Sequence, residues 1–250
     1  MVRAAGLTDI GKVRSINQDS FQIVEDKNIY IVADGMGGHA AGDQASRIAV
    51  KTILEILSAY DFSSEASGPD DAESGMSIEE LIRYALQEAN EQILLASLSN
   101  QHLQGMGTTA IVGVEHRGSM YVGHIGDSRT YLVRNQQLSQ ITEDHSVVQQ
   151  LVKAGAISEE EAQVHPYKNV ITRCLGMQAN VEPDTMELVL QAGDRILMCS
   201  DGLSNMVSNQ TMQQVVNDNP DPQPACEKLI MLANENGGTD NITVVLLYND

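Results

Sequence analysis

The chain has 250 residues, of which 42% are hydrophobic, and no Pro-, Gly- or Ser-rich linker divides it, so we expect one domain spanning residues 1–250 with a substantial core. Its 15 basic and 34 acidic residues give a net charge of −19, which disfavours binding to nucleic acid or to an anionic membrane surface. No apolar run approaches the roughly 18 residues that span a bilayer, and the first residues lack the long apolar segment of a secretory signal, so a cytoplasmic location is expected.

The first part of the chain is predicted to form short strands followed by two helices. Strands are expected at residues 4–8, 20–24 and 29–33, separated by polar turns. The apolar residues then recur at helical spacing over residues 45–60 and again over residues 78–93. An acidic stretch rich in Ser and Gly, residues 61–77, lies between them and is expected to be a surface loop. Each helix has one apolar stripe, so both could pack against the same sheet.

The second part continues with strands. Those at residues 108–115, 119–125 and 129–134 are joined by short turns and are expected to be antiparallel neighbours, with 138–142 continuing the meander. Residues 143–180 are mixed in character, with a helical piece at 147–153, and are predicted to form a flap over an active site. Further elements are expected as strands at 185–190, 195–199 and 243–248 and helices at 209–217 and 223–234. The pattern predicts an α+β fold of mainly antiparallel sheets with segregated helices.

Several aspartates occur where an apolar strand meets a turn of small residues. Strand ends that are far apart in sequence can converge at one edge of a sheet, so these carboxylates are expected to share a pocket. The five are Asp19, Asp34, Asp127, Asp201 and Asp240. Gly35 follows one of them, and because glycine lets the backbone approach an ion closely, its carbonyl oxygen could be a further ligand.

A cluster of carboxylates without His or Cys pairs at ligand spacing favours Mg²⁺ or Mn²⁺ over zinc or copper. The three cysteines are widely spaced and odd in number, which also argues against a disulfide framework or a zinc site. Two such ions can share one water, lower its pKa and hold it as a nucleophile, which indicates phosphoester hydrolysis. Arg14, five residues before Asp19, has the planar guanidinium that binds phosphate oxygens.

Six segments together resemble the motifs of the metal-dependent Ser/Thr protein phosphatases of type 2C, the PPM family, in its compact bacterial form. They are residues 11–19, 32–39, 107–109, 126–129, 199–203 and 240–244, in this order. The resemblance covers nearly the whole chain. It implies a four-layer α-β-β-α sandwich, in which two antiparallel sheets are flanked by helix pairs.

The resemblance also implies a role for each candidate residue. Asp34 would bridge two metal ions, the Gly35 carbonyl would bind one of them, and Asp201 with Asp240 would bind the other. Asp19 would join the same centre directly or through water. The remaining roles would be a third, weaker metal site at Asp127 with Asp201, phosphate binding by Arg14, and a further site residue at Asn241.

Two points of the resemblance stay open at this stage. His39 would act as general acid near the leaving group, although metal-bound water could also deliver the proton. Gln18 stands where some members of the family carry a glutamate, and it cannot supply a charged ligand, so the arrangement around Asp19 is not fixed by the motif.

The predicted activity is therefore hydrolysis of phosphoserine and phosphothreonine in proteins by attack of a water that bridges two Mg²⁺ or Mn²⁺ ions. The expected partners are phosphorylated proteins or peptides, and the enzyme would oppose Ser/Thr kinases in signalling, as a monomer. Two alternatives come from other classes. One is a regulatory module that binds partners and uses metal only structurally, and the other is a two-metal nuclease, which the net charge of −19 weakens.

Overall fold

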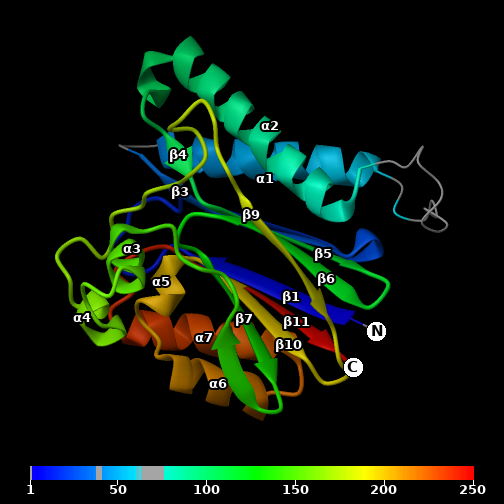
Figure 1. Ribbon diagram of the computed structural model, residues 1–250. Coiled ribbons are helices and arrows are strands. Elements are labelled where there is room, and N and C mark those ends of the chain that lie inside the picture. The colour runs from blue at the N-terminus through cyan, green and yellow to red at the C-terminus, as the bar shows by residue number, and fades with distance from the viewer. Residues whose placement is uncertain (1, 38–40, 61, 63–75) are drawn as a thin grey trace.

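Two antiparallel sheets form the centre of the computed structural model, which describes residues 2–37, 41–60, 62 and 76–250 (Figure 1). One sheet, called the β11 sheet, has the strand order β1 (Val2–Asp9), β11 (Ile242–Asn249), β10 (Arg195–Cys199), β7 (Arg129–Arg134) and β8 (Gln137–Gln140). The other, called the β3 sheet, has the order β2 (Asp19–Val24), β3 (Ile29–Met36), β5 (Ala110–His116), β6 (Ser119–Ile125) and β9 (Asp184–Val189), with β4 (Gly107–Thr108) paired to the end of β3.

Helices cover the outer face of each sheet. α1 (Ala41–Ala59) and α2 (Ile78–Ser99) pack on the β3 sheet, while α5 (Asp201–Ser204), α6 (Asn209–Asp218) and α7 (Pro222–Glu235) lie on the side of the β11 sheet (Figure 1). The predicted α+β class and the four layers are confirmed, as is the packing of both early helices on one sheet. Two 3₁₀ turns, Glu25–Lys27 and Gln101–Leu103, complete the regular structure together with α3 (Val147–Lys153) and α4 (Glu159–Gln163).

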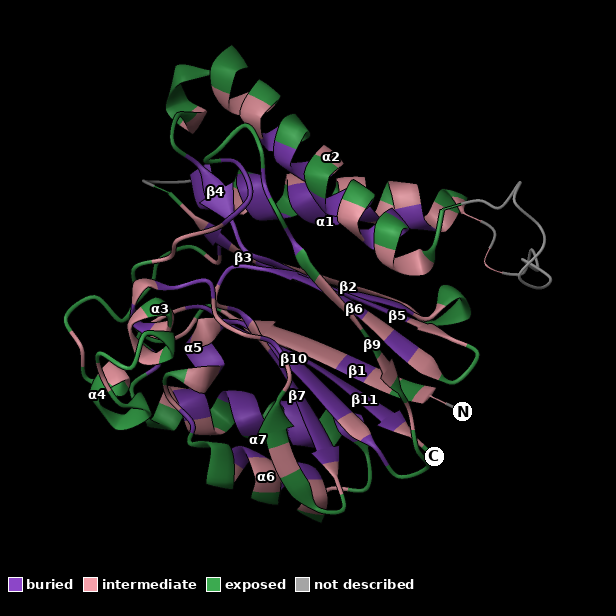
Figure 2. Cartoon of the chain, in the orientation of Figure 1, coloured by how far each residue is buried: buried purple, intermediate pink, exposed green. Residues whose placement is uncertain are grey.

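The three apolar layers follow from the twofold alternation of side chains along each strand. In β3, Ile29, Ile31 and Ala33 face α1 and α2, whereas Tyr30 and Val32 face the other sheet. β11 follows the same rule, with its even-numbered positions packed against α7 and its odd-numbered ones between the sheets. Because the central strands are buried on both faces, they are mostly apolar, and Figure 2 shows them largely in the colour of buried residues.

One predicted strand pairing is wrong. β6 and β7 are not neighbours, because the chain crosses from the β3 sheet to the β11 sheet at the turn 126–128. β7 pairs instead with β10 and β8, and β6 with β5 and β9. A short turn between two apolar runs is typical of a hairpin, and strands that are buried on both faces carry no pattern that would distinguish the two arrangements.

The predicted boundaries of helices and strands agree closely with the structure where the apolar residues form a clear pattern in the sequence. The predicted limits of β6, β7, β10 and α3 are confirmed, whereas α1 begins four residues earlier than predicted, at Ala41. α2 begins at a capping box, in which the Ser77 hydroxyl accepts the Glu80 N–H and the Glu80 carboxylate accepts the Ser77 N–H. The short helices α4 and α5 were not predicted. None of the described helices is long and apolar enough to cross a bilayer.

Two leucines of α2 provide a matched test of the layer between this helix and the β3 sheet. Leu86 is fully buried, whereas Leu98 is 82% exposed. Leu86→Ala should lower the free energy of unfolding by about 2–5 kcal/mol, because it leaves a cavity in the core, and Leu98→Ala should change it by less than about 0.5 kcal/mol. Urea denaturation followed by circular dichroism measures both values. Equal effects of the two substitutions would contradict this packing.

Candidate metal centre

The predicted aspartates lie at one end of both sheets, the end opposite the chain termini (Figure 1). Asp19 begins β2 and stands directly opposite Asp34 in the pairing of β2 with β3. Asp127 follows β6, Asp201 follows β10 at the start of α5, and Asp240 precedes β11. A cavity of about 280 Å³ opens there, lined by Arg14, Gln18, Asp34, Gly35, Met36, Gly37, Thr109, Asp127, Asn169, Ile171, Asp201 and Asp240.

Burial and mutual repulsion make four of these carboxyl groups reluctant to ionise, those of Asp19, Asp34, Asp127 and Asp201. Burial is the main cause that raises the pKa of Asp34 well above its ordinary value, and the charges of the other four aspartates add to it. Burial likewise raises the pKa of Asp19 to about 6 and that of Asp201 to about 6, with smaller contributions from neighbouring carboxylates. The pKa of Asp127 rises to about 7 for the same reasons. The five side chains therefore interact as one cluster, whose negative charge Arg14 and Arg129 compensate only in part.

Asp19 is held by hydroxyl groups from the opposite sheet. Ser200 Oγ and Thr243 Oγ1 both donate to its Oδ2, at 2.8 and 2.7 Å. Its Oδ1 is buried and has no hydrogen-bond partner. One carboxylate oxygen is thus fixed by the protein, and the other is left available to an ion.

Asp201 follows the same pattern. Asn205 Nδ2 donates to its Oδ2 at 3.0 Å, whereas its Oδ1 is buried without a partner. Two buried, unpartnered carboxylate oxygens in one cluster are costly unless a cation or a proton satisfies them. An oxygen-only donor set of this kind suits Mg²⁺ or Mn²⁺.

Close backbone packing surrounds Gly35. A Cβ atom at this position would lie 2.1 Å from the Gly42 carbonyl oxygen and 2.5 Å from the Gln18 carbonyl oxygen, so only glycine fits. The neighbouring Asp34 main chain is fixed by Thr109, whose Oγ1 accepts the Asp34 N–H at 3.0 Å. The end of β3 is therefore rigidly placed beside the cavity.

Arg14 reaches the cluster from the loop between β1 and β2. Its Nη2 donates to Asp240 Oδ2 at 2.7 Å, and its side chain is 49% exposed. Asn241 holds this loop in place: its Nδ2 donates to the Ile10 and Ile16 carbonyls at 3.0 Å, and its Oδ1 accepts the Gln18 N–H at 2.8 Å. Asn241 is buried, and these contacts make it a support for the loop that carries Arg14.

Of the other predicted residues, His39 lies outside the described residues. Gln18 lines the cavity, and its carbonyl accepts the Gly35 N–H at 3.2 Å and the Ser46 hydroxyl at 2.6 Å.

Asn169 and Ile171, from the segment predicted to be a flap, also line the cavity. Sequence reasoning did not assign them, nor the supporting side chains Ser200, Thr243 and Asn205. Ser200 and Thr243 lie within predicted motifs, but their contact with Asp19 depends on strand register.

Within the described ranges, no group of three or more His, Cys, Asp or Glu side chains is already arranged to hold a metal ion. The predicted ligands also include a backbone carbonyl, at Gly35, and the carboxylates repel one another. Bound ions would have to draw the carboxylates together, and they would add positive charge to that of Arg14. The residues present fit Mg²⁺ or Mn²⁺ in donor type and in their two unpartnered oxygens.

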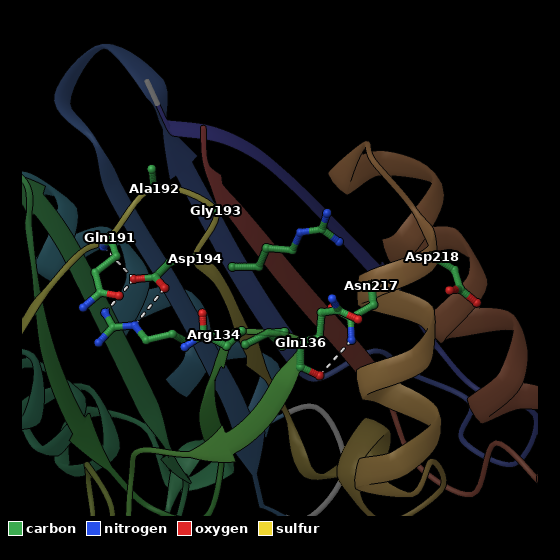
Figure 3. Close-up of a pocket in the computed structure, with 11 residues that line it drawn as sticks. Arg134, Gln136, Gln191, Ala192, Gly193, Asp194, Asn217 and Asp218 are labelled. Atoms are coloured by element: carbon green, nitrogen blue, oxygen red, sulfur yellow. Dashed lines mark hydrogen bonds and ion pairs between the residues drawn. The ribbon is translucent and has the colours of Figure 1, made fainter.

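A larger cavity, of about 530 Å³, lies at the other end of β7 and β10 (Figure 3). Its main charged groups bind each other: Arg134 donates to both carboxylate oxygens of Asp194, at 2.9 and 2.6 Å. Arg195 donates to the Val216 carbonyl and lies over the Tyr248 ring, with 4.4 Å between Cζ and the ring centroid. Among the described residues, only two aspartates line this cavity: Asp194, which is paired with Arg134, and Asp218, which is exposed to solvent. It therefore does not contain the several carboxylates that a dinuclear centre needs.

Comparison with known proteins gives consistent results. The family model described as protein phosphatase 2C matches residues 12–235. A relative from Listeria monocytogenes, the serine/threonine phosphatase stp, is 42% identical over 246 residues, covering 97% of this chain and 94% of the relative.

Solved structures are similar over the same length. The Mycobacterium tuberculosis serine/threonine phosphatase PstP/Ppp has a TM-score of 0.88 at 36% identity, with 100% of this chain and 99% of that chain covered. A structure of the catalytic domain of PstP in complex with two manganese ions has a TM-score of 0.84 at 36% identity, with 99% and 97% covered.

Metal binding should be tied to pH through the buried carboxylates. Because the folded-state pKa values of Asp19, Asp127 and Asp201 are raised from 3.8 to about 6 or 7, these three carboxyl groups bind more protons in the metal-free folded protein than in the unfolded chain between about pH 4 and pH 7. Their contribution to the stability of the metal-free protein should therefore fall as the pH rises through this window. Divalent ions compete with these protons, so they should stabilise the protein more at the higher pH.

Thermal unfolding with and without Mn²⁺ tests this linkage. The rise in Tm on adding Mn²⁺ should be larger at about pH 7.5 than at about pH 5, by at least about 2 °C, since each displaced proton changes the binding free energy by about 1.4 kcal/mol per pH unit. A rise in Tm that is the same at both pH values, or larger at the lower one, would contradict the assignment of these carboxylates as ligands.

Proposed function

Because the chain belongs to the protein phosphatase 2C family and is a metal-dependent serine/threonine protein phosphatase, we propose that it hydrolyses phosphoserine and phosphothreonine in proteins by direct attack of water, without a phosphoenzyme. The observation that carries this proposal is the cavity in which four carboxylates and the Arg14 guanidinium meet. The proposed catalytic domain spans residues 1–250.

We propose that Mg²⁺ or Mn²⁺ fills two core positions in this cavity. Asp34 would bridge them, with the Gly35 carbonyl on one ion and Asp201 with Asp240 on the other. Asp19, opposite Asp34, would join the same centre directly or through water. Asp127 with Asp201 would hold a third, weaker ion. When bound, the ions supply a nucleophilic water of lowered pKa and positive charge opposite the phosphate oxygens. The two manganese ions named for the PstP catalytic domain support the core pair.

The protein's own side chains would orient the substrate. Arg14 is half exposed and uses one nitrogen, Nη2, to bind Asp240, so its other N–H groups can bind phosphate oxygens at the mouth of the cavity. His39 is proposed to donate a proton to the leaving oxygen. Residues 143–180 are proposed to form a flap, since Asn169 and Ile171 line the cavity on that side.

The cellular role is proposed from the reaction. An enzyme that removes phosphate from serine and threonine opposes the Ser/Thr kinases that attach it, so we propose a function in signalling, in the cytoplasm and as a monomer. The net charge of −19 supports protein substrates over nucleic acids, since it would repel a polyphosphate backbone.

Hydrolysis of a phosphothreonine peptide tests the activity and its metal requirement. Turnover should need Mn²⁺ or Mg²⁺, stop with EDTA, and fall at least about 100-fold in Asp34→Ala, since the bridging carboxylate would be lost. Asp26→Ala is the control, because Asp26 is an exposed carboxylate of a 3₁₀ turn away from the cavity. Metal-independent turnover, or full activity of Asp34→Ala, would contradict the proposal. A folded, metal-loaded protein without turnover would favour the regulatory module.

The role of Arg14 can be tested separately at saturating Mn²⁺. Arg14→Ala should lower kcat/KM for the phosphopeptide about 10- to 100-fold, because hydrogen bonds to a charged group are worth about 1.5–3 kcal/mol. Arg3→Ala is the matched control, since Arg3 is also part exposed and paired with aspartates, Asp221 and Asp250, but lies at the far end of β1. Similar kinetic constants for the two variants would remove Arg14 from the substrate site.

A further inference from the structure

His145, at the start of the segment 143–180, makes four hydrogen bonds and is only 3% exposed. Its main-chain N–H donates to the Gly126 carbonyl at 2.8 Å, and its carbonyl accepts the Thr172 N–H at 2.7 Å. Its ring Nδ1 accepts the Gly126 N–H at 3.1 Å, and its Nε2 lies 3.1 Å from Asp184 Oδ2. Both polar groups of the Gly126 main chain are therefore bound by this one residue.

These contacts fix the tautomer of the ring. A backbone N–H can only donate, so Nδ1 carries the lone pair and the ring proton is on Nε2, where it is donated to the Asp184 carboxylate. The His124 ring packs against it, with 4.5 Å between ring centroids. Burial lowers the pKa of both histidines, that of His124 to about 3, which agrees with two neutral rings.

Gly126 is a position that only glycine fits. Its φ is +112°, and a Cβ there would lie 2.5 Å from Thr109 Cγ2, so the turn between β6 and β7 is pressed against Thr109. The Gly126 N–H is buried, so it depends on the hydrogen bond to His145 Nδ1 to avoid an unfavourable unpaired state. The next residue is Asp127, so the direction of its side chain depends on how this peptide is held.

The same histidine joins the base of the segment 143–180 to this turn. Thr172, on the returning limb, binds its carbonyl, and the bridge between Ser146 and Ile171 continues the pairing of the two limbs. Asp184, which accepts from the ring, is also bound by Arg173 at 2.9 Å. The limbs of the segment, strand β9 and the turn that carries Asp127 thus meet at one residue, His145, whose main chain binds Thr172 and Gly126 and whose ring binds Gly126 and Asp184.

We propose that His145 is a positioning residue, whose neutral ring holds the Gly126 N–H through Nδ1 and thereby directs the Asp127 carboxylate for binding of the weaker third metal ion. The inference rests on the proposed assignment of Asp127 as a ligand. It makes the occupancy of that ion depend on a contact at the base of the segment 143–180.

Two substitutions separate the contacts of the ring. The side-chain oxygen of asparagine is bonded to Cγ, as Nδ1 of histidine is, so His145→Asn keeps an acceptor for the Gly126 N–H and loses the contact with Asp184. The side-chain nitrogen of glutamine is one bond further out, so His145→Gln keeps a donor for Asp184 and loses the acceptor. Asparagine is the smaller residue, so loss of packing alone would harm His145→Asn more.

Two readouts are measured on the full chain. Hydrogen–deuterium exchange without metal reports the Gly126 amide, and calorimetric titration with Mn²⁺ reports the number and affinity of bound ions, with Asp127→Ala as reference. We expect His145→Gln to speed exchange at Gly126 and to weaken the third ion at least about 10-fold, as loss of supporting contacts to metal ligands does. His145→Asn should stay within about 3-fold of the wild type in both.

Each other outcome counts against the inference. Equal loss in both variants, or a greater loss in His145→Asn, would assign His145 to packing and overturn its positioning role. If Asp127→Ala binds as many ions as the wild type, the assignment of Asp127 fails and the inference fails with it. If Asp127→Ala loses one ion while His145→Gln does not, the ligand assignment stands and only the positioning role is overturned.

Discussion

The register of β2 against β3 sets Asp19 opposite Asp34, so a buried and a partly buried carboxylate share one sheet end. Like charges at this separation cannot both be ionised cheaply in a buried site, and Asp127, Asp201 and Asp240 add to the repulsion. The protein can keep this arrangement only with protons or cations bound. Ser200 binds one carboxylate oxygen of Asp19, and Asn205 binds one carboxylate oxygen of Asp201. In each case the other oxygen of the carboxylate is left without a hydrogen-bond partner.

The cluster also requires both sheets. Asp19 and Asp34 belong to strands β2 and β3 of the β3 sheet, and Asp127 follows β6 of the same sheet, whereas Asp201 and Asp240 flank β10 and β11 of the β11 sheet. The hydroxyls of Ser200 and Thr243 cross from one sheet to the other to bind Asp19. The apolar layer between the sheets therefore sets the positions of the five carboxylates relative to one another. Metal binding should accordingly be coupled to the packing of the β3 sheet against the β11 sheet.

Sequence patterns predict the parts of this architecture that are encoded locally. The limits of β6, β7 and β10 follow from their apolar runs, and the aspartates are recognisable because each stands between a strand and a small-residue turn. α4 and α5 have five and four residues, too few to show a helical period. The early start of α1 at Ala41 lies in a stretch of small residues that carries no apolar stripe.

What could not be predicted depends on contacts between distant segments. The crossing from β6 to β7 resembles a hairpin in sequence, and only the packing of two sheets decides it. Thr243 and Asp19 are 224 residues apart in the sequence, and His145 and Gly126 are 19 apart. Neither contact therefore produces a periodic pattern in the sequence that would predict it. Arg14 was predicted as a phosphate ligand, but its contact with Asp240 follows from the loop geometry that Asn241 maintains.

The central claim is that this carboxylate cluster is a dinuclear metal centre bridged by Asp34. Anomalous scattering from a crystal grown with Mn²⁺ tests it most directly. The account predicts two strong peaks, one on either side of the Asp34 carboxylate and about 3.5–4 Å apart, as in other two-metal sites. Manganese found only elsewhere, such as in the cavity beside Arg134 and Asp194, would contradict it.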